Sequence, residues 1–416
     1  MPSAEIVAVG SELLTPLKAE TNSLWLTGEL NSAGVDVLLK TVVGDDEARL
    51  EEALRDALKR SDIIITTGGL GPTEDDITRP VAARAVDRKL EYHEELEAEL
   101  RERFKRWGRE MPEINKRQAF VVEGSETLPN PNGSAVGMLL EFDRKLLVVL
   151  PGPPREMRPM YRDHVAERIK RLGGGTIAVR RLLRVSGMGE SAVDEAIAPI
   201  YRSYANVETS ILFTRAEVEV HLAARSDDAA AAEAQLDELS GRIAEKLGLA
   251  VISTNGESIE EIVGRMLSER GETLAVAESC TGGLIGMRLT EVPGSSRYYL
   301  EGAITYSNEA KMRALGVPES VISAHGAVSA ETAEAMASGI RERAKAFYGL
   351  SVTGIAGPDG GSDDKPVGTV HIGYSDKADT RSVRFVFPGD RELIRWRSSQ
   401  AALDYLRRRL MKGDRR

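Results

Sequence analysis

The sequence has one cysteine, Cys280, in 416 residues, so no disulfide can form within the chain. This scarcity fits a reducing compartment. No segment approaches the roughly 18 consecutive apolar residues that a membrane-spanning helix needs. The N-terminal stretch MPSAEIVAVGSELL also lacks the basic start and long apolar run of a secretory signal. We therefore expect a cytoplasmic protein without membrane attachment.

An excess of positive charge is also absent. Lys and Arg number 55 against 65 Asp and Glu, which gives a formal net charge of −10. Such a chain repels a phosphate backbone unless a local patch reverses the field, so nucleic-acid binding is not expected. With 42% hydrophobic and 29% charged residues the composition is that of a globular protein. At roughly 150 residues per domain, the length predicts two or three domains.

The first part of the chain alternates short apolar segments with longer amphipathic ones. The expected strands and helices occupy residues 5–9, 21–33, 35–43, 48–60 and 62–67. This βαβα order predicts a mainly parallel sheet covered by helices, with a ligand crevice at the carboxyl ends of the strands. A long surface helix is expected over residues 91–107, acidic early and basic late. We assign residues 1–172 to this domain.

Gly173–Gly175 marks the first break, and the segment 176–252 then reads βαββαβ, a small split sheet. Its sequence GMGESA satisfies G-x-G-x-x-A, but the segment is too short for a doubly wound dinucleotide fold. Ser258 and Glu261 form an S-x-x-E capping box that opens the next helix. From there an α/β pattern returns, and we assign residues 257–412 to a third domain. The final MKGDRR is expected to be a polar tail.

A glycine-rich loop with acidic residues follows the apolar segment 62–67 and reads GGLGPTEDD over residues 68–76. Glycines let backbone N–H groups approach a phosphate closely, whereas three acidic residues repel it unless a divalent cation lies between. One interpretation is a metal-bridged diphosphate site. The alternative is a glycine turn followed by the acidic, solvated start of a helix.

A second strand-to-helix junction, AESCTGG over residues 277–283, carries Ser279. Free N–H groups at a helix start would favour an oxyanion near its hydroxyl. If Asn308 caps a later helix, Lys311 lies in the first turn of that helix. A cation is disfavoured there, so its pKa should fall and the neutral amine could take a proton from a serine. The alternative makes Ser279 a simple cap and Lys311 a surface residue.

Other chemically capable groups lie near these motifs. A glycine-dense loop, residues 354–361, follows a predicted strand, and Arg391 could give a phosphate a bidentate partner. Cys280 adjoins Ser279, so a cysteine amidase is a possible alternative, but none of the five histidines lies in a recognisable partner motif. The histidines also lack the paired spacing of a zinc site, and His221 and His371 are expected in strands.

Four further motifs accompany the glycine loop in the first domain. They are GSELL at 10–14, TN at 21–22, NGSA at 132–135 and PGPPREM at 151–157. Together the five motifs resemble the molybdopterin-binding fold, and more closely the N-terminal domain of the CinA (competence/damage-inducible protein A) family. The resemblance implies a three-layer domain and a metal-dependent ADP-ribose pyrophosphatase that forms AMP and ribose 5-phosphate.

The resemblance also assigns residues to roles in this first site. The metal, Mg²⁺, Mn²⁺ or Co²⁺, would neutralise charge and orient or activate a water. The residues implied are Gly68, Gly69, Gly71 and Thr73 as the phosphate cradle, Asp75 and Asp76 as metal ligands, and Glu12 and Asn22 on the ribose side.

The last domain carries AESCTGG, TYSNEAK, TGIAGPDGG, KPVGTV and GDR between about residues 258 and 410. These motifs resemble the CinA C-terminal domain, a family of nicotinamide mononucleotide deamidases. The resemblance implies metal-free hydrolysis of the nicotinamide carboxamide to a carboxylate and ammonia. Spacing leaves open which of Lys311 and Tyr306 is the base. The implied roles are Ser279 as nucleophile, Lys311 with Tyr306 for proton transfer, Thr353 as a substrate or oxyanion contact, Arg391 as an anion-binding or catalytic residue, and Gly282, Gly283, Gly354 and Gly357 as substrate-binding residues.

The middle segment resembles a KH-type module, which in other proteins binds RNA. It holds 8 Lys and Arg against 12 Asp and Glu and lacks a GXXG loop, so a linker or dimerisation role is the better interpretation. We expect a three-domain α/β homodimer of pyridine-nucleotide salvage whose small-molecule partners are nicotinamide mononucleotide and ADP-ribose. The alternatives are a regulator linked to DNA uptake and a molybdopterin-related nucleotidyl transfer by the first domain.

Overall fold

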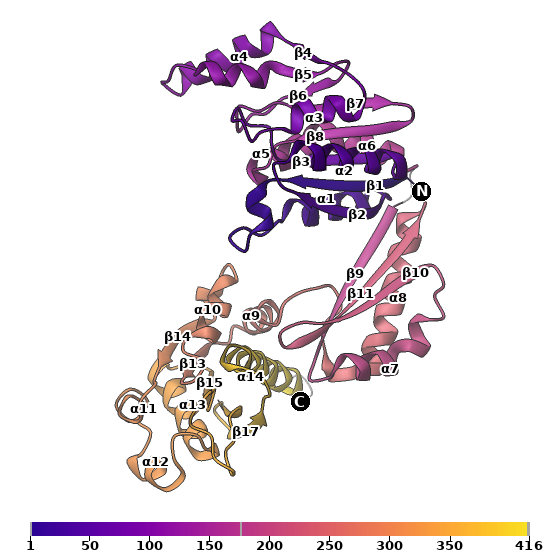
Figure 1. Ribbon diagram of the computed structural model, residues 1–416. Coiled ribbons are helices and arrows are strands. Elements are labelled where there is room, and N and C mark those ends of the chain that lie inside the picture. Colours follow the sequence, from indigo (N-terminus) through magenta and orange to yellow (C-terminus); the bar gives the residue numbers. More distant parts are fainter. Residues whose placement is uncertain (1, 175–176, 414–416) are drawn as a thin grey trace. The chain divides into compact units, whose positions relative to one another are not determined.

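The computed structural model describes residues 2–174 and 177–413 (Figure 1). Gly175, the expected domain start at residue 176 and the last three residues of the polar tail lie outside this description. The chain divides into two compact units. One comprises Met1–Val179 with Arg225–Glu233, and the other comprises Arg180–Ala224 with Ala234–Arg416. None of the helices in the described ranges combines the length and apolar composition needed to cross a membrane.

The first unit is built on a six-stranded sheet of order β2-β1-β3-β8-β7-β6. Neighbours from β2 to β8 run parallel, and β7 and β6 are antiparallel additions. The expectation of a mainly parallel sheet is therefore met at its centre. The strands are β1 (Ser3–Val9), β2 (Asp36–Val43), β3 (Ile63–Thr67), β6 (Glu126–Leu128), β7 (Gly137–Phe142) and β8 (Lys145–Leu150).

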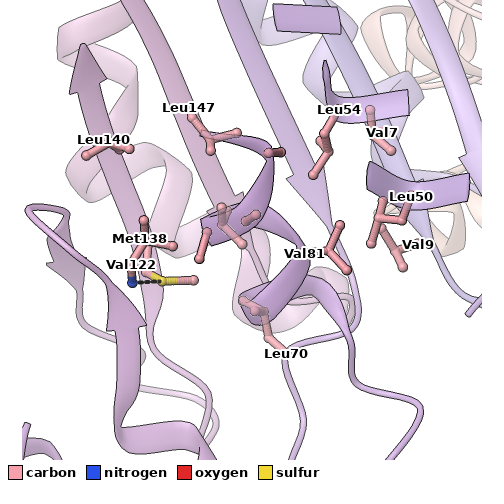
Figure 2. Packing of buried hydrophobic residues seen from close by; sticks show 14 of the residues in the cluster. Val7, Val9, Leu50, Leu54, Leu70, Val81, Val122, Met138, Leu140 and Leu147 are labelled. Carbon is pink, nitrogen blue, oxygen red and sulfur yellow. Dashed lines mark hydrogen bonds between the residues drawn. The ribbon is translucent and has the colours of Figure 1, made fainter. Parts of the chain in front are cut away.

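Helices cover both faces of this sheet and give three layers. On one face, Leu50 and Leu54 of α2 and Val81 of α3 pack against strand residues (Figure 2). The spacing of four in α2 thus marks its buried stripe, as predicted. On the other face, Leu26 and Met157 belong to the second cluster. The helices are α2 (Glu47–Arg60) and α3 (Thr78–Ala85), then α1 (Asn22–Ser32), α5 (Pro154–Met160), the π-helical turn η3 (Tyr161–Val165) and α6 (Ala166–Leu172).

The predicted long surface helix is shorter than expected. It is α4 (Glu94–Arg106), because Leu90–Tyr92 form a strand, β4, that pairs with β5 (Phe120–Val122). Leu96 and Leu100 are buried, as its apolar stripe predicts, but Trp107 stays half-exposed after the last turn. The remaining elements of this unit are η1 (Ser11–Leu14) and η2 (Glu113–Ala119).

The middle segment has the predicted βαββαβ order. Its sheet order is β10-β11-β9-β12, and α8 buries Leu236, Leu239 and Ile243 at helical spacing. The elements are β9 (Ile177–Ser186), α7 (Glu190–Tyr201), β10 (Val207–Phe213), β11 (Glu217–Ser226), α8 (Ala229–Leu247), η4 (Gly248–Ala250) and β12 (Val251–Ser253).

The last segment repeats the three-layer design on the sheet β14-β13-β15-β16-β17. The first three strands are parallel, and β16 and β17 are antiparallel. The predicted capping box of Ser258 and Glu261 opens α9, and both of its hydrogen bonds are present. The strands are β13 (Leu274–Glu278), β14 (Tyr299–Ile304), β15 (Tyr348–Gly354), β16 (Thr369–Ser375) and β17 (Thr380–Val386).

Two hydrophobic clusters place the helices of this segment on opposite faces. Ile262 of α9, Ile285 of α10 and Leu403 of α14 share one cluster, while Met336 of α13 and Leu315 of α11 share the other. The helices are α9 (Ile259–Arg270), α10 (Leu284–Glu291), α11 (Asn308–Leu315), α12 (Glu319–His325), α13 (Ala330–Ala344) and α14 (Arg391–Gly413), with the turn η5 (Ser295–Arg297). Loops after the parallel strands β3, β13 and β14 hold the motifs GGLGPTEDD, AESCTGG and TYSNEAK.

Two helical glycines make this packing testable. A Cβ on Gly339 of α13 would lie 1.9 Å from the Leu315 carbonyl oxygen, whereas a Cβ on Gly241 of α8 meets nothing within 4 Å. Gly339→Ala should lower the free energy of unfolding by about 1–3 kcal/mol, because the clash outweighs the gain in helix propensity. Gly241→Ala should raise it by roughly 0.5–1 kcal/mol. Urea denaturation measures the free energy of unfolding of each variant. Changes of the same sign and size in the two variants would contradict the packing.

Candidate active sites

The glycine loop of the first unit is held where three parallel strands end. The Gly68 N–H donates to the Leu150 carbonyl at 3.0 Å, and a Cβ on Gly68 would lie 2.2 Å from the Val9 carbonyl oxygen. A Cβ on Gly69 would lie equally close to Thr78 Oγ1, at 2.2 Å. The φ angles of the two glycines are +110° and +64°. Only glycine fits these positions, because both the space and the backbone conformation exclude a side chain.

Asp76 closes this loop on itself. Its carboxylate accepts hydrogen bonds from Gly71 N at 2.7 Å, Thr73 N at 2.9 Å and Thr73 Oγ1 at 2.6 Å. The expected phosphate cradle needs correction here. The amides of Gly71 and Thr73 serve Asp76 and that of Gly68 serves Leu150, so these donors are already used. Both oxygens of Asp76 hold the loop, which leaves Asp75 as the metal-ligand candidate of the pair.

A buried arginine also stabilises this loop. Arg79 is 3% exposed, and its guanidinium donates to the carbonyls of Leu70 and Gly71. Burial lowers the pKa of Arg79 to about 10, so it remains charged at neutral pH. Arg79 was not among the predicted site residues, although an arginine in the first turn of the helix after a glycine loop is a visible signal.

Asp75 and Glu12 are the acidic candidates for holding a metal at this site. The Thr73 hydroxyl, which also donates to Asp76, lies close enough to Asp75 to lower the pKa of its carboxyl group. The Glu12 carboxylate accepts a hydrogen bond from Lys18 Nζ at 2.8 Å, which lowers the pKa of Glu12, while the charge of Asp75 acts in the opposite direction. The two carboxylates thus sense each other's charge, as expected for groups on one site.

Asn22, predicted on the ribose side, lies at the same end of the sheet. Its Nδ2 donates to Thr67 Oγ1 at 2.9 Å and to the Gly152 carbonyl at 2.7 Å. Its buried Oδ1 finds no donor among the described residues. An orphaned acceptor of this kind is available to a ligand hydroxyl.

The donor set suits one kind of metal binding. The described residues contain no group of three or more His, Cys, Asp or Glu that could hold an ion by themselves. Mg²⁺ is often bound by one or two carboxylates together with substrate phosphates. Asp75, with Glu12 near it, fits that mode.

In the second unit, Ser279 lies at the meeting point of three parallel strand ends. Its N–H donates to the Val352 carbonyl of β15 at 2.9 Å, and the Thr305 N–H donates to the Glu278 carbonyl at 2.8 Å. Ser279 is 8% exposed. The hydroxyl is therefore fixed at the carboxyl edge of the sheet, where the α/β pattern predicts a ligand crevice.

Lys311 lies directly beside this serine. Its Nζ is 3.2 Å from Ser279 Oγ, 2.9 Å from the Thr305 carbonyl oxygen and 3.4 Å from the Tyr306 carbonyl oxygen. The side chain is 1% exposed, and burial lowers the pKa of Lys311. The pKa of Lys311 is thus lowered, as expected, but the main cause is desolvation and not the position of the lysine in the helix. The cap is also Ser307, whose hydroxyl accepts from Ala310 N at 3.1 Å, and not Asn308.

Glu278 changes the expected picture of the helix start. Its carboxylate is 2% exposed and accepts from the amides of Gly283 at 3.0 Å, Ile285 at 3.2 Å and Gly286 at 2.9 Å. These amides are therefore unavailable to an oxyanion, contrary to the sequence expectation. The helix α10 also begins at Leu284 instead of Thr281. The position of Glu278, at the end of a buried strand and shortly before Gly282 and Gly283, was the sequence signal for this helix cap.

The other predicted residues gather around the serine. Arg391 Nη2 donates to the Tyr306 hydroxyl at 3.0 Å, and its Nη1 donates to the Gly357 carbonyl at 2.8 Å. Tyr306 is 63% exposed. Thr353 is buried, and its hydroxyl donates to the Ala327 carbonyl at 2.7 Å. Tyr306 thus pairs with Arg391, while Lys311 reaches the serine.

The glycines near Ser279 shape its loops. Gly282 and Gly283 have φ angles of +62° and +94°, and a Cβ on Gly354 would lie 2.8 Å from the Thr369 carbonyl oxygen. The Gly282 N–H donates to the Ser279 carbonyl at 3.1 Å. Arg395, which the sequence analysis did not select, donates through Nη2 to the Thr281 carbonyl at 2.8 Å. It adds a second cation, one helical turn after Arg391, at the serine turn.

Cys280 is a poor nucleophile candidate. Its side chain is 5% exposed, and burial raises the pKa of the thiol to about 12. A thiol that stays protonated at neutral pH does not attack an amide. His221 lies in β11 and His371 in β16, as expected.

Comparison with known proteins matches the whole of this arrangement to one family. Residues 5–171 match the model described as "Probable molybdopterin binding domain", residues 180–252 the "Damage-inducible protein CinA KH domain" and residues 256–410 the "CinA C-terminal domain".

Relatives confirm that the match extends along the chain. A CinA-like protein of Solibacter usitatus is 48% identical, with 98% of both chains covered, and one of Koribacter versatilis is 48% identical over 98% of this chain and all of the relative. A crystal structure of a competence/damage inducible protein, CihA, from Agrobacterium tumefaciens is 39% identical, with a TM-score of 0.36, and covers 38% of this chain and 99% of its own. This mixed α/β chain carries the three segments in the same order as its relatives and belongs to the CinA family.

Proposed function

We propose that the Ser279 site deamidates nicotinamide mononucleotide to nicotinate mononucleotide and ammonia. The observation that carries this proposal is the 3.2 Å contact between a buried lysine amine and a serine hydroxyl. A serine is a weak nucleophile unless a neighbouring base removes its proton. Lys311 is that base, since Tyr306 is engaged with Arg391.

The surroundings of Lys311 orient its lone pair. A neutral amine has two N–H donors and one lone pair, and the carbonyls of Thr305 and Tyr306 accept the two donors. The lone pair then faces Ser279 Oγ. Ser279 attacks the carboxamide carbon as its proton passes to Lys311, and the same proton leaves with the ammonia. Water cleaves the resulting ester by the reverse use of the same pair.

Cations at the rim suit an anionic substrate. Arg391 and Arg395 lie one turn apart on α14 and both contact the loops around Ser279. A guanidinium binds a phosphate through paired hydrogen bonds, so these arginines are placed to hold a mononucleotide. Thr353 would contact the substrate beside the nucleophile.

For the first unit we propose hydrolysis of the ADP-ribose diphosphate. A divalent cation at Asp75 would neutralise the diphosphate and orient or activate a water. Asn22 Oδ1 would accept a ribose hydroxyl, and Gly69 would let the diphosphate approach the backbone. Asp76 and Arg79 keep the loop in shape for this task.

Two other functions remain distinguishable by experiment. A DNA-uptake regulator, which the names of relatives suggest, should retain DNA in a salt-sensitive manner, and the net charge of −10 counts against it. A molybdopterin-related transferase should turn over molybdopterin in place of ADP-ribose. Incubating the purified protein with each substrate separates these functions.

Removal of the base should stop deamidation without unfolding the protein. Lys311→Met should lower kcat by a factor of about 10²–10⁴, because the hydroxyl loses its proton acceptor. Ser279→Ala should abolish turnover. Neither change should lower the melting temperature much, since methionine fills the buried site without a desolvation penalty. Full activity of Lys311→Met, measured as ammonia release, would exclude the mechanism.

Deamidation should also depend on pH in a defined direction. Burial places the pKa of Lys311 below its ordinary value, so the reactive neutral form increases as pH rises and the rate levels off above that pKa. Because the unfolded chain binds this proton more tightly, raising the pH through the interval between the two pKa values should also favour folding. In Lys311→Met both dependences should disappear from the rate and stability profiles. A pH-rate profile that falls across this interval would contradict the assignment.

Glu278 should influence deamidation by holding the serine turn. Glu278→Ala should reduce kcat by about tenfold or more, with little change in KM, because three amides of α10 lose their acceptor. Glu278→Gln should recover part of the loss. Glu291→Gln, at the exposed opposite end of the same helix, is the control and should behave as the wild type. A normal kcat in Glu278→Ala would disprove the positioning role.

The metal site can be tested within one loop. Asp75→Asn should reduce ADP-ribose hydrolysis by roughly a hundredfold and lower the melting temperature less than Asp76→Asn does, since Gly71 and Thr73 form three hydrogen bonds with Asp76. Asp76→Asn should lower the melting temperature, because its carboxylate holds the loop together. Glu74→Gln, an exposed neighbour paired with Arg117, is the control. EDTA should stop ADP-ribose hydrolysis alone, and loss of deamidation with EDTA would refute the metal-free mechanism.

A further inference from the structure

A separate cavity of about 620 Å³ opens within the second unit, away from the serine site. It is bounded by the turn after β9, the end of β10, the strand β17 and one face of α14. Neither Ser279 nor Lys311 lines it. A volume of this size is typical of small-molecule sites, which range from about 300 to 1,000 Å³.

Three phenylalanines give this cavity an aromatic wall. Phe385 of β17 and Phe387, just after the end of this strand, have nearly parallel rings, with 5.2 Å between centroids and 10° between planes. Phe213, at the end of β10, is 47% exposed although it lies against the cavity. Flat aromatic ligands stack on such surfaces, and the contact tolerates any ring system.

Two arginines of α14 also line the cavity. Arg397 lies over the Phe213 ring, with its guanidinium carbon 5.8 Å from the centroid, and forms no salt bridge within the described ranges. Arg408 donates through Nε to Asp404 at 2.8 Å, and its Nη2 would be 3.9 Å from a Cβ on Gly187. Eleven residues at 1.5 Å each separate the two arginines along α14 by roughly 16 Å.

The charge of the lining is positive. Asp404 is buried and also accepts from Arg407, so one carboxylate is shared by two arginines. Of the residues that line the cavity, Arg397 and Arg408 are cationic and Asp404 is the only acid, so the lining carries an excess of one positive charge in a chain whose total charge is −10. A partly buried positive excess of this kind is complemented by an anionic ligand.

We propose that the cavity binds a nucleoside monophosphate. The base lies against Phe385 and Phe387, Arg397 meets the acceptor edge of the base, and Arg408 with the Gly187 turn receives the phosphate. A ligand with an aromatic ring but no phosphate would not contact Arg408. A ligand with a phosphate but no ring would not contact the phenylalanines. This site is independent of the two proposed active sites.

The test uses the full chain and the probe AMP, measured by isothermal titration calorimetry. Arg408→Ala and Phe387→Ala should each weaken one AMP-binding event by about tenfold or more. Arg381→Ala is the control, since this exposed arginine of β17 pairs with Asp379 and does not line the cavity. Adenosine and ribose 5-phosphate should each bind this site more weakly than AMP.

Location is tested with the photoreactive analogue 8-azido-AMP, followed by peptide mapping. We expect labelling of the peptide that contains Phe385 and Phe387, and loss of that label in Arg408→Ala. Labelling confined to the glycine loop or the Ser279 turn would overturn the proposal, as would unchanged AMP affinity and stoichiometry in both cavity variants. Normal circular dichroism of the variants ensures that lost binding reflects the site and not unfolding.

Discussion

A buried amine beside a hydroxyl is the interaction on which the chemistry proposed for the second unit depends. Lys311 has no acidic partner among the described residues, and its Nζ contacts only Ser279 and two carbonyl oxygens. These contacts do not compensate for the free-energy cost of removing water from a charged amine, so they favour the neutral form. The sheet enforces this placement, because β13 ends at the serine and β14 leads directly into the helix that carries the lysine.

Both units stabilise their reactive loops by the same physical device. In the first, Asp76 binds the amides of its own glycine loop, and in the second, Glu278 binds the amides that open α10. Each carboxylate satisfies donors that a short strand-to-helix turn would leave exposed. The loops therefore keep their shape without a ligand. Stabilisation of an oxyanion or a phosphate must then come from other donors in the site.

Much of the fold follows from patterns that the sequence displays. The alternation of apolar and amphipathic segments predicts the strands and helices of both parallel sheets, and the Ser258 capping box is found as predicted. The shortened α4 shows the limit of this reading, because Glu91 has the charge of a helix residue but lies in a strand that pairs with β5. Long-range pairing of this kind has no local signal.

The site was predictable by residue but not by role. Motif positions correctly brought Ser279, Lys311, Tyr306 and Arg391 to neighbouring loops. Spacing could not show that Tyr306 turns to Arg391 while Lys311 reaches the serine. Nor could it show that Asp76 is engaged by its own loop, because the use of a hydrogen-bond donor depends on the folded turn. The sequence therefore does not show which acceptor each hydrogen-bond donor binds when several polar groups lie close together.

The environment of Cys280 also determines how the enzyme meets oxidising conditions. Thiolates, and not thiols, react with peroxides and form mixed disulfides. Cys280 is both buried and held protonated, although it is the immediate neighbour of Ser279 in the chain. With Ser279 as the proposed nucleophile and the chain's only sulfhydryl shielded, the proposed deamidation does not depend on the redox poise of its surroundings.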